Sequence, residues 1–145
     1  IALIKATVDQ MATRGYGRVV NITSAAVKAP IDFLGLSNGA RSGLTGFVAG
    51  LSRQPQLAGR GVTINSILPG AFDTDRLKQG FKAAAAKAGL TPEQMADQRR
   101  VMVPVQRFGN AAEFGELCAY LCSQQAGYIT GQNLLIDGGA YPGTY

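Results

Sequence analysis

The hydrophobic pattern of the chain alternates between a helical repeat and short β-branched runs. Apolar side chains recur every three or four positions over residues 1–13, which predicts an opening helix that ends where Gly15 breaks the repeat. Continuous apolar runs over 18–23, 61–68 and 132–136 are typical of strands covered on both faces. The pattern therefore predicts one helix and three buried strands.

Helical patterns fill the segments between and after these strands. One runs over 37–57 with a break near Pro55, and residues 75–101 predict one or two surface helices. Thr91 and Asn110 each stand three positions before a Gln or Glu, which is typical of a capped helix start. Strands that alternate with covering helices favour an α/β fold with a parallel sheet.

Four glycines lie at helical spacing along one face of the 37–57 helix: Gly39, Gly43, Gly46 and Gly50. Each costs about 1 kcal/mol relative to alanine inside a helix, so the stripe needs a reason. It either allows a tight helix–helix contact between subunits or allows close packing against the chain's own sheet. Both explanations stay open from the sequence.

The composition limits the chemistry. The 145 residues include 14 Lys and Arg against 9 Asp and Glu, with no histidine. This excludes a histidine-based nucleophile relay and any histidine-ligated zinc or haem, and we expect no metal site. The cations are scattered, so we expect no nucleic-acid partner, and no stretch is long enough to predict a membrane span.

Two cysteines, Cys118 and Cys122, fall on one face of the predicted helix that begins after Asn110. Helical spacing disfavours a disulfide between them. We expect two buried free thiols, as in a cytoplasmic protein.

Four motif blocks carry a family resemblance. They are Gly-Arg-Val-Val-Asn-Ile-Thr-Ser over 17–24, Asn-Ser-Ile-Leu-Pro-Gly over 65–70, Pro-Val-Gln-Arg-Phe-Gly over 104–109, and Thr-Gly-Gln-Asn-Leu-Leu-Ile-Asp-Gly-Gly over 130–139. In order and spacing the chain resembles the short-chain dehydrogenase/reductase family, and most the classical reductases typified by 3-oxoacyl-carrier-protein reductase.

This resemblance implies the C-terminal half of a Rossmann-type doubly wound parallel sheet, with strands five to seven and their covering helices. We expect residues 1–145 to form a single partial domain that lacks the N-terminal dinucleotide-binding half. The strand over 18–23 would then have an unpaired edge, for which a partner half or a swapped assembly is expected.

The resemblance also places the catalytic positions. In the family a serine orients the substrate oxygen, a tyrosine transfers its proton, and a lysine four residues later lowers the tyrosine pKa and holds the nicotinamide ribose. Spacing puts Ser24 at the serine, Ser37 at the tyrosine and Arg41 at the lysine position. A serine hydroxyl is shorter and less acidic than a phenol, and a guanidinium stays protonated, so atypical or weakened catalysis is expected. Tyr141 and Tyr145 lie on a tail that reaches a neighbouring active site in some oligomers of the family.

The cofactor implied by the resemblance is NAD or NADP. Pro69, Gly70, Phe72 and Thr74 match the family's Pro-Gly-x-x-x-Thr element, and with Arg41 they would contact the nicotinamide end. A strand exit followed by a loop cap is the alternative explanation of this element. No glycine-rich phosphate-binding turn follows a strand in the chain, so we expect these residues alone to bind the dinucleotide weakly or not at all.

Two function hypotheses follow from the family. The first is an NAD(P)-dependent oxidoreductase that acts on a small carbonyl or alcohol substrate. The second is a catalytically silent relative that acts as a scaffold or subunit. For either, a homo-oligomer formed through residues 1–13 and 37–54 is expected.

A third hypothesis is a serine hydrolase with Ser24 or Ser37 as the nucleophile and Lys28 or Arg41 nearby. Without histidine only a Ser-Lys relay is available. Lys28 follows Ser24 by four positions on a predicted loop, whereas the known motif spaces the two residues by three on a helix.

Overall fold

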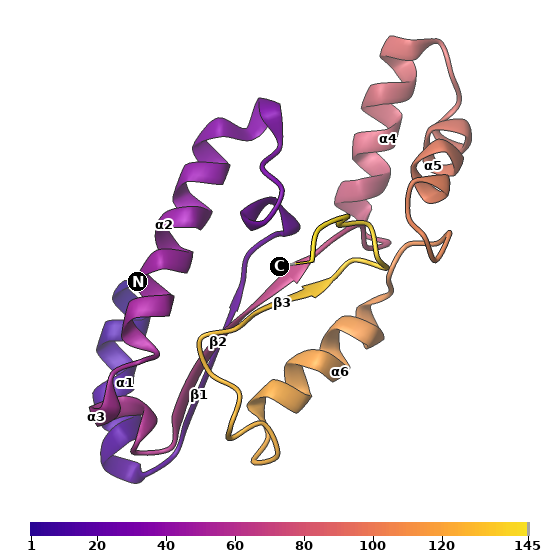
Figure 1. The fold of residues 1–145 in the computed structure, drawn as a ribbon. Coiled ribbons are helices and arrows are strands. Elements are labelled where there is room, and N and C mark those ends of the chain that lie inside the picture. The colour runs from indigo at the N-terminus through magenta and orange to yellow at the C-terminus, as the bar shows by residue number, and fades with distance from the viewer. Residues whose placement is uncertain (145) are drawn as a thin grey trace.

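The computed structural model describes residues 1–144. Figure 1 shows the helices and strands in chain order. The elements are α1 (Ala2–Arg14), β1 (Gly17–Ile22), the 3-10 turns η1 (Ala25–Val27) and η2 (Asp32–Leu34), α2 (Gly35–Leu51), α3 (Pro55–Ala58), β2 (Val62–Pro69), α4 (Asp75–Ala88), α5 (Pro92–Val101), α6 (Ala111–Cys122) and β3 (Asn133–Ile136).

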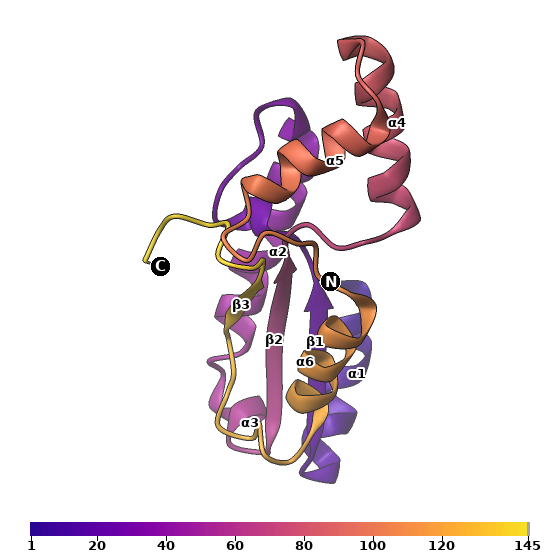
Figure 2. The same ribbon diagram turned by 90° about the vertical axis from the view of Figure 1, so that its right-hand side faces the viewer.

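The three strands form a parallel sheet in the order β1-β2-β3. The register places Gly17 opposite Val62, and Ser66 opposite Asn133. Helices α1, α2 and α3 cover one face of the sheet and α6 covers the other, and the arrowheads of the strands point toward α4 and α5 (Figure 2). The predicted α/β class is confirmed, because apolar strands with both faces covered require helices on both sides.

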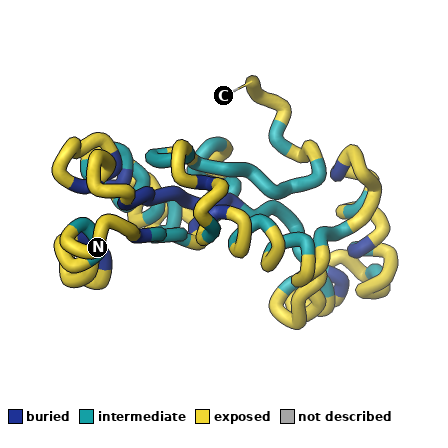
Figure 3. Tube along the Cα trace, turned by 90° about the horizontal axis from the view of Figure 1, so that it is seen from below, coloured by how far each residue is buried: buried dark blue, intermediate teal, exposed yellow. Residues whose placement is uncertain are grey.

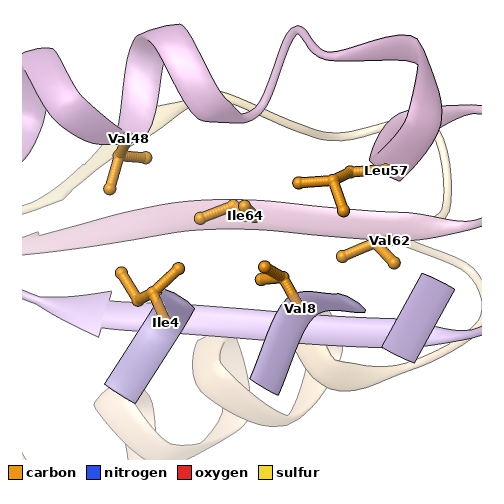
Figure 4. Packing of buried hydrophobic residues seen from close by; sticks show 6 residues of the cluster. All are labelled: Ile4, Val8, Val48, Leu57, Val62 and Ile64. Carbon is orange, nitrogen blue, oxygen red and sulfur yellow. The ribbon is translucent and has the colours of Figure 1, made fainter. Parts of the chain in front are cut away.

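The core is divided by β2 into two clusters. Figure 4 shows the first cluster, in which Val62 and Ile64 of β2 meet Ile4 and Val8 of α1 together with Val48 and Leu57. Successive side chains of a strand point to opposite faces, so Ile67 packs instead against Leu121 of α6. Residues 62–68 are all buried, and the buried positions concentrate along the middle of the sheet (Figure 3).

Strand β1 is less buried than its sequence predicts. Arg18, Val19, Val20 and Asn21 are only partly buried, and Ile22 is 61% exposed. Within residues 1–144 no strand pairs with the far edge of β1, which leaves its outer side uncovered. Both faces of β1 are covered as predicted, since Val19 packs against the cluster of α1 and α2 and Val20 packs against the cluster of α6. The expected burial of the whole strand is wrong for β1, because its outer edge is open, and right for β2.

The predicted helices are found with small shifts at their ends. Helix α2 begins at Gly35 instead of 37, and the predicted loop over 24–36 contains η1 and η2. The segment 75–101 forms two helices, α4 and α5. Both predicted capping boxes are present, Thr91 with Gln94 and Asn110 with Glu113.

The glycine stripe of α2 faces outward. Gly39, Gly43, Gly46 and Gly50 are exposed, and a Cβ atom added at any of them would meet nothing within 4 Å among the described residues. Close packing against the chain's own sheet is therefore wrong as the reason for the stripe. The sheet-facing side of α2 carries Val48 and its larger apolar neighbours instead.

Both cysteines of α6 are free thiols, as predicted. Cys118 packs against the cluster around Ile67, and burial, followed by the neighbouring Cys122, raises its pKa. Cys122 is exposed, so the prediction that it is buried is wrong. At this end of the helix Leu121 takes the buried position.

Among residues 1–144, no helix has an apolar stretch long enough to cross a bilayer.

Candidate functional site

A cleft of about 990 Å³ opens at the carboxyl ends of β1 and β2. In open parallel sheets this edge is where ligands bind. Its walls come from the turn after β1, the start of α2, the loop after β2, helices α4 and α5, and the start of α6. The lining includes the residues that the resemblance assigns to catalysis and to the nicotinamide end, namely Ser24, Ser37, Arg41, Pro69, Gly70, Phe72 and Thr74.

Arg41 and Ser37 form a hydrogen-bonded pair on one face of α2. Arg41 Nε donates to Ser37 Oγ at 3.0 Å, and Arg41 Nη1 donates to the carbonyl oxygen of Thr23 at 2.6 Å. The guanidinium thereby links the first turns of α2 to the end of β1. Because Ser37 Oγ accepts from Arg41, its own hydroxyl proton is free for an acceptor in the cleft.

Ser24 follows β1 directly and caps η1. Its Oγ accepts a hydrogen bond from the backbone N–H of Ala26 at 3.1 Å, and its backbone is extended. This bond leaves the hydroxyl proton of Ser24 available as well. Two partly buried hydroxyl donors, Ser24 and Ser37, therefore line the same cleft.

Gly70 directly follows β2 and lies against the end of β3. Its N–H donates to the carbonyl of Ile136 at 3.0 Å, and a Cβ atom at this position would lie 2.6 Å from Asp137 Cβ. Only glycine fits this contact without a shift of Asp137. The Pro69-Gly70 pair therefore fixes where the chain leaves the sheet and enters the cleft wall.

The loop after Gly70 is held from both sides. Phe72 forms a bridge with Gly109, and its ring meets the ring of Phe114 edge-on at 5.6 Å between centroids. Thr74 Oγ1 accepts from the N–H of Leu77 at 3.2 Å, which caps α4. The loop-cap alternative thus describes Thr74 correctly, and the hydroxyl proton of Thr74 is still free for a ligand.

An ion pair between Arg107 and Glu113 holds the segment that contains Gly109, the bridge partner of Phe72. Arg107 donates to both carboxylate oxygens of Glu113, at 2.9 and 2.5 Å, and the Asn110 N–H donates to the same carboxylate at 2.9 Å. The hydrogen bond from Arg107, followed by that from Asn110, lowers the pKa of Glu113 to about 2. The pKa of Arg107 is raised in turn by Glu113.

Helices α4 and α5 contribute a wall that the sequence did not predict. The surface-helix interpretation of 75–101 missed that one side of each helix faces the cleft. The cleft lining includes Leu77, Phe81 and Ala84 on α4, Met95 on α5 and Met102 directly after it, together with Arg76 and Arg99. The signal was the helical spacing of these apolar residues, but it was weak because polar and charged residues are interspersed.

Two other candidate groups lie outside the cleft lining. Lys28 Nζ lies over the ring of Tyr141 at 5.8 Å from its centroid, and neither residue lines the cleft in the part of the chain that the structure describes. A Ser-Lys relay between Ser24 and Lys28 therefore has no support from this arrangement. Tyr145, the other tail phenol, lies outside the described residues.

Within residues 1–144 no group of three or more cysteine, aspartate or glutamate side chains is placed to hold a metal ion.

The parallel sheet, the helices on both of its faces and the cleft at its carboxyl edge define a Rossmann-type α/β protein. A family model described as enoyl-(acyl carrier protein) reductase matches residues 1–141. The chain belongs to the short-chain dehydrogenase/reductase family.

Individual relatives agree with this assignment. The chain is 33% identical to an acetoacetyl-CoA reductase of Cupriavidus necator over 141 residues, which cover 96% of the chain and 51% of that protein. It is also 33% identical to the 3-oxoacyl-[acyl-carrier-protein] reductase FabG of Vibrio cholerae, covering 96% and 52%. The chain spans about half the length of the curated relatives it matches.

A solved structure has the same fold. The crystal structure of YwfH, an NADPH-dependent reductase involved in bacilysin biosynthesis, superposes with a TM-score of 0.88 at 30% identity. The superposition covers 98% of this chain and 54% of YwfH. The prediction of a partial Rossmann-type sheet is therefore confirmed.

Proposed function

We propose that the protein is an NAD(P)-dependent oxidoreductase that acts on a small carbonyl or alcohol substrate. The observation that carries this proposal is the meeting of Ser24, Ser37 and Arg41 with the 69–74 loop in one cleft at the carboxyl edge of the sheet. The names of the relatives, a 3-oxoacyl-[acyl-carrier-protein] reductase and an acetoacetyl-CoA reductase, support the same reaction class.

The cleft fits the nicotinamide end of a dinucleotide. Its volume of about 990 Å³ is in the range of cofactor sites, and the free hydroxyl of Thr74 and the polar backbone after Gly70 lie on its wall. The nicotinamide, when bound, would supply or accept the hydride. In this proposal the backbone at Phe72 and the hydroxyl of Thr74 hold the carboxamide, and Arg41 binds ribose hydroxyls or a phosphate.

The two serines act on the substrate oxygen. The hydroxyl of Ser24 donates a hydrogen bond that orients the substrate oxygen. The hydroxyl of Ser37, which accepts from Arg41, donates a second hydrogen bond to the same oxygen. These bonds would polarise a carbonyl without a strong acid next to it. Because positioned general acids contribute about 10²–10⁴ in rate, we expect slow turnover relative to an enzyme with a phenol at this position.

The proposal is tested by following the nicotinamide absorbance with a panel of ketones, aldehydes and alcohols. The assay uses the product of the longest reading frame that contains this chain, with both NADH and NADPH. We expect slow turnover that falls further in Ser24→Ala and stays unchanged in Ser42→Ala, an exposed serine of α2 outside the cleft lining. Absence of turnover with both cofactors contradicts the proposal and favours the catalytically silent alternative.

We further propose that residues 1–13 and 37–54 join two copies of the protein, as an active enzyme or as a silent subunit. The outward-facing glycines of α2 support this, since they let another helix approach closely. On α1, Leu3 is 82% exposed, an apolar side chain that a partner would cover. Sedimentation should show a dimer or larger assembly that Gly43→Gln weakens. A native protein that is monomeric at every concentration contradicts the proposal.

The remaining half of the cofactor site is proposed to come from the segment that the relatives carry and these residues do not. It would cover the free edge of β1 and supply the glycine-rich turn that binds the pyrophosphate. The codons upstream of Ile1 test this directly, because they either encode such a turn after a strand or they do not. The two free thiols support a cytoplasmic location, which cell fractionation would test.

A further inference from the structure

Two arginine side chains line the cleft on elements other than those that carry Ser24 and Ser37. Arg76 lies in the first turn of α4 and Arg99 in the last turn of α5, and both line the cleft. Within residues 1–144 neither of them forms a salt bridge or a side-chain hydrogen bond, whereas Arg41 is bonded to Ser37 and Thr23. Their charges are therefore available to a ligand.

Neighbouring charges do not neutralise these two arginines. Arg100, next to Arg99 in sequence, pairs with Asp97 and lies over the ring of Phe108, and it lines a different groove on the other side of α5. Among the described residues that line the cleft, one has a carboxylate side chain, Asp73. This carboxylate pairs with Lys78 at 3.1 Å. The cleft thus holds more positive than negative charge.

The surroundings of Arg76 and Arg99 strengthen their attraction for an anion. The same wall carries the apolar side chains of Leu77, Phe81 and Met95, which compete for no hydrogen bonds. Low-dielectric walls concentrate the field of a charged cleft. A guanidinium binds a carboxylate through two parallel hydrogen bonds, which favours planar oxyanions over neutral polar groups.

We infer that the substrate carries an anionic oxygen group, such as a carboxylate, at some distance from its reacting carbonyl. Arg76 and Arg99 bind this group while the carbonyl lies at Ser24 and Ser37. The carbonyl part of the inference rests on the proposed oxidoreductase function. The anion-binding part is independent of it. A second source of the same anionic chemistry is a phosphate of the dinucleotide.

The test compares oxo carboxylates with their neutral methyl esters in the product of the longest reading frame. A series from 2-oxohexanoate to 5-oxohexanoate varies the separation of the two groups. For the best member we expect kcat/KM of the acid to exceed that of the ester by about tenfold or more. In Arg76→Gln and Arg99→Gln this ratio should fall by about the same factor. In Lys87→Gln, on α4 but outside the cleft lining, it should not change.

Calorimetric titration of the same acids without dinucleotide gives a readout that needs no turnover. Arginine-dependent binding of the acid without any reduction supports the anion site and contradicts the oxidoreductase proposal. Turnover with no preference for acid over ester supports the oxidoreductase and overturns the anion site. If Arg76→Gln and Arg99→Gln raise the KM for the dinucleotide but leave the ratio of kcat/KM for acid and ester unchanged, the arginines bind the cofactor. That result also overturns the inference. Urea denaturation of each variant checks that the fold is kept.

Discussion

Arg41 Nε donates a hydrogen bond to Ser37 Oγ at 3.0 Å, one helical turn along α2. A second bond from the same guanidinium reaches the carbonyl of Thr23 at 2.6 Å. The family resemblance predicts that these two residues occupy the positions of its tyrosine and lysine. The guanidinium fixes the geometry of the pair, but it stays protonated and cannot pass a proton.

The first prediction concerns this pair. Ser37→Tyr combined with Arg41→Lys should raise turnover of a ketone by about 10²–10⁴, because a phenol next to an ammonium group is a far better proton donor than an aliphatic hydroxyl. The measurement is kcat from nicotinamide absorbance. The control is Ser37→Phe with Arg41→Lys, which adds the ring without its hydroxyl and should give no gain. Equal rates in both double variants would contradict a role for the phenol.

The second prediction contrasts two glycines. Gly70→Ala should destabilise the protein by about 1–3 kcal/mol, because the new Cβ would lie 2.8 Å from Asp137 Cα in the backbone of the neighbouring segment. Gly43→Ala meets nothing within 4 Å and should stabilise α2 by about 0.5–1 kcal/mol at concentrations that keep the protein dissociated. Urea midpoints measure both changes. A similar effect of the two substitutions would be inconsistent with the close contact at Gly70.

The third prediction concerns pH. The Glu113 carboxylate, with a native pKa of about 2, stays ionised in the folded protein after its unfolded form has taken up a proton near pH 4.3. Its contribution to stability is therefore complete above about pH 4.5 and is lost as the pH falls toward 2. Glu113→Gln should flatten the loss of stability in this window. Denaturation midpoints between pH 2 and 6 measure it.

The control for this prediction is Glu116→Gln, an exposed carboxylate of α6 that has no ion pair within the described residues. This variant should keep the native slope between pH 2 and 4.5. If Glu113→Gln and the native protein lose stability in parallel, the ion pair with Arg107 does not act as described.

The fourth prediction concerns the core cluster in which β2 packs against α1 and α2. Ile64 is fully buried between α1 and α2, so Ile64→Ala should cost about 2–5 kcal/mol through lost burial and the cavity left behind (Figure 4). Val101→Ala, on the exposed side of α5, should change stability by less than about 0.5 kcal/mol. Denaturant titration measures both. A small effect at Ile64 would mean that α1 and α2 do not depend on this contact.

Most of the local structure of the chain was predictable from the sequence alone. The capping boxes at Thr91 and Asn110 were predictable because a cap involves only neighbouring residues. The apolar run over 61–68 predicted the buried strand β2 because the side chains on both faces of a strand come from the same short stretch of sequence. The family resemblance placed Ser24, Ser37 and Arg41, and the structure brings them together in one cleft.

Which surface each element covers became clear from the three-dimensional fold and not from local patterns. An apolar or glycine-rich face shows that something packs against it, but not what does. The glycines of α2 therefore gave two explanations, and the fold removed one by turning them outward. Arg76 and Arg99 lie more than twenty residues apart on two different helices, so no local pattern could predict that they line the same cleft. Contacts between distant segments depend on how helices cross the sheet, which local spacing does not encode.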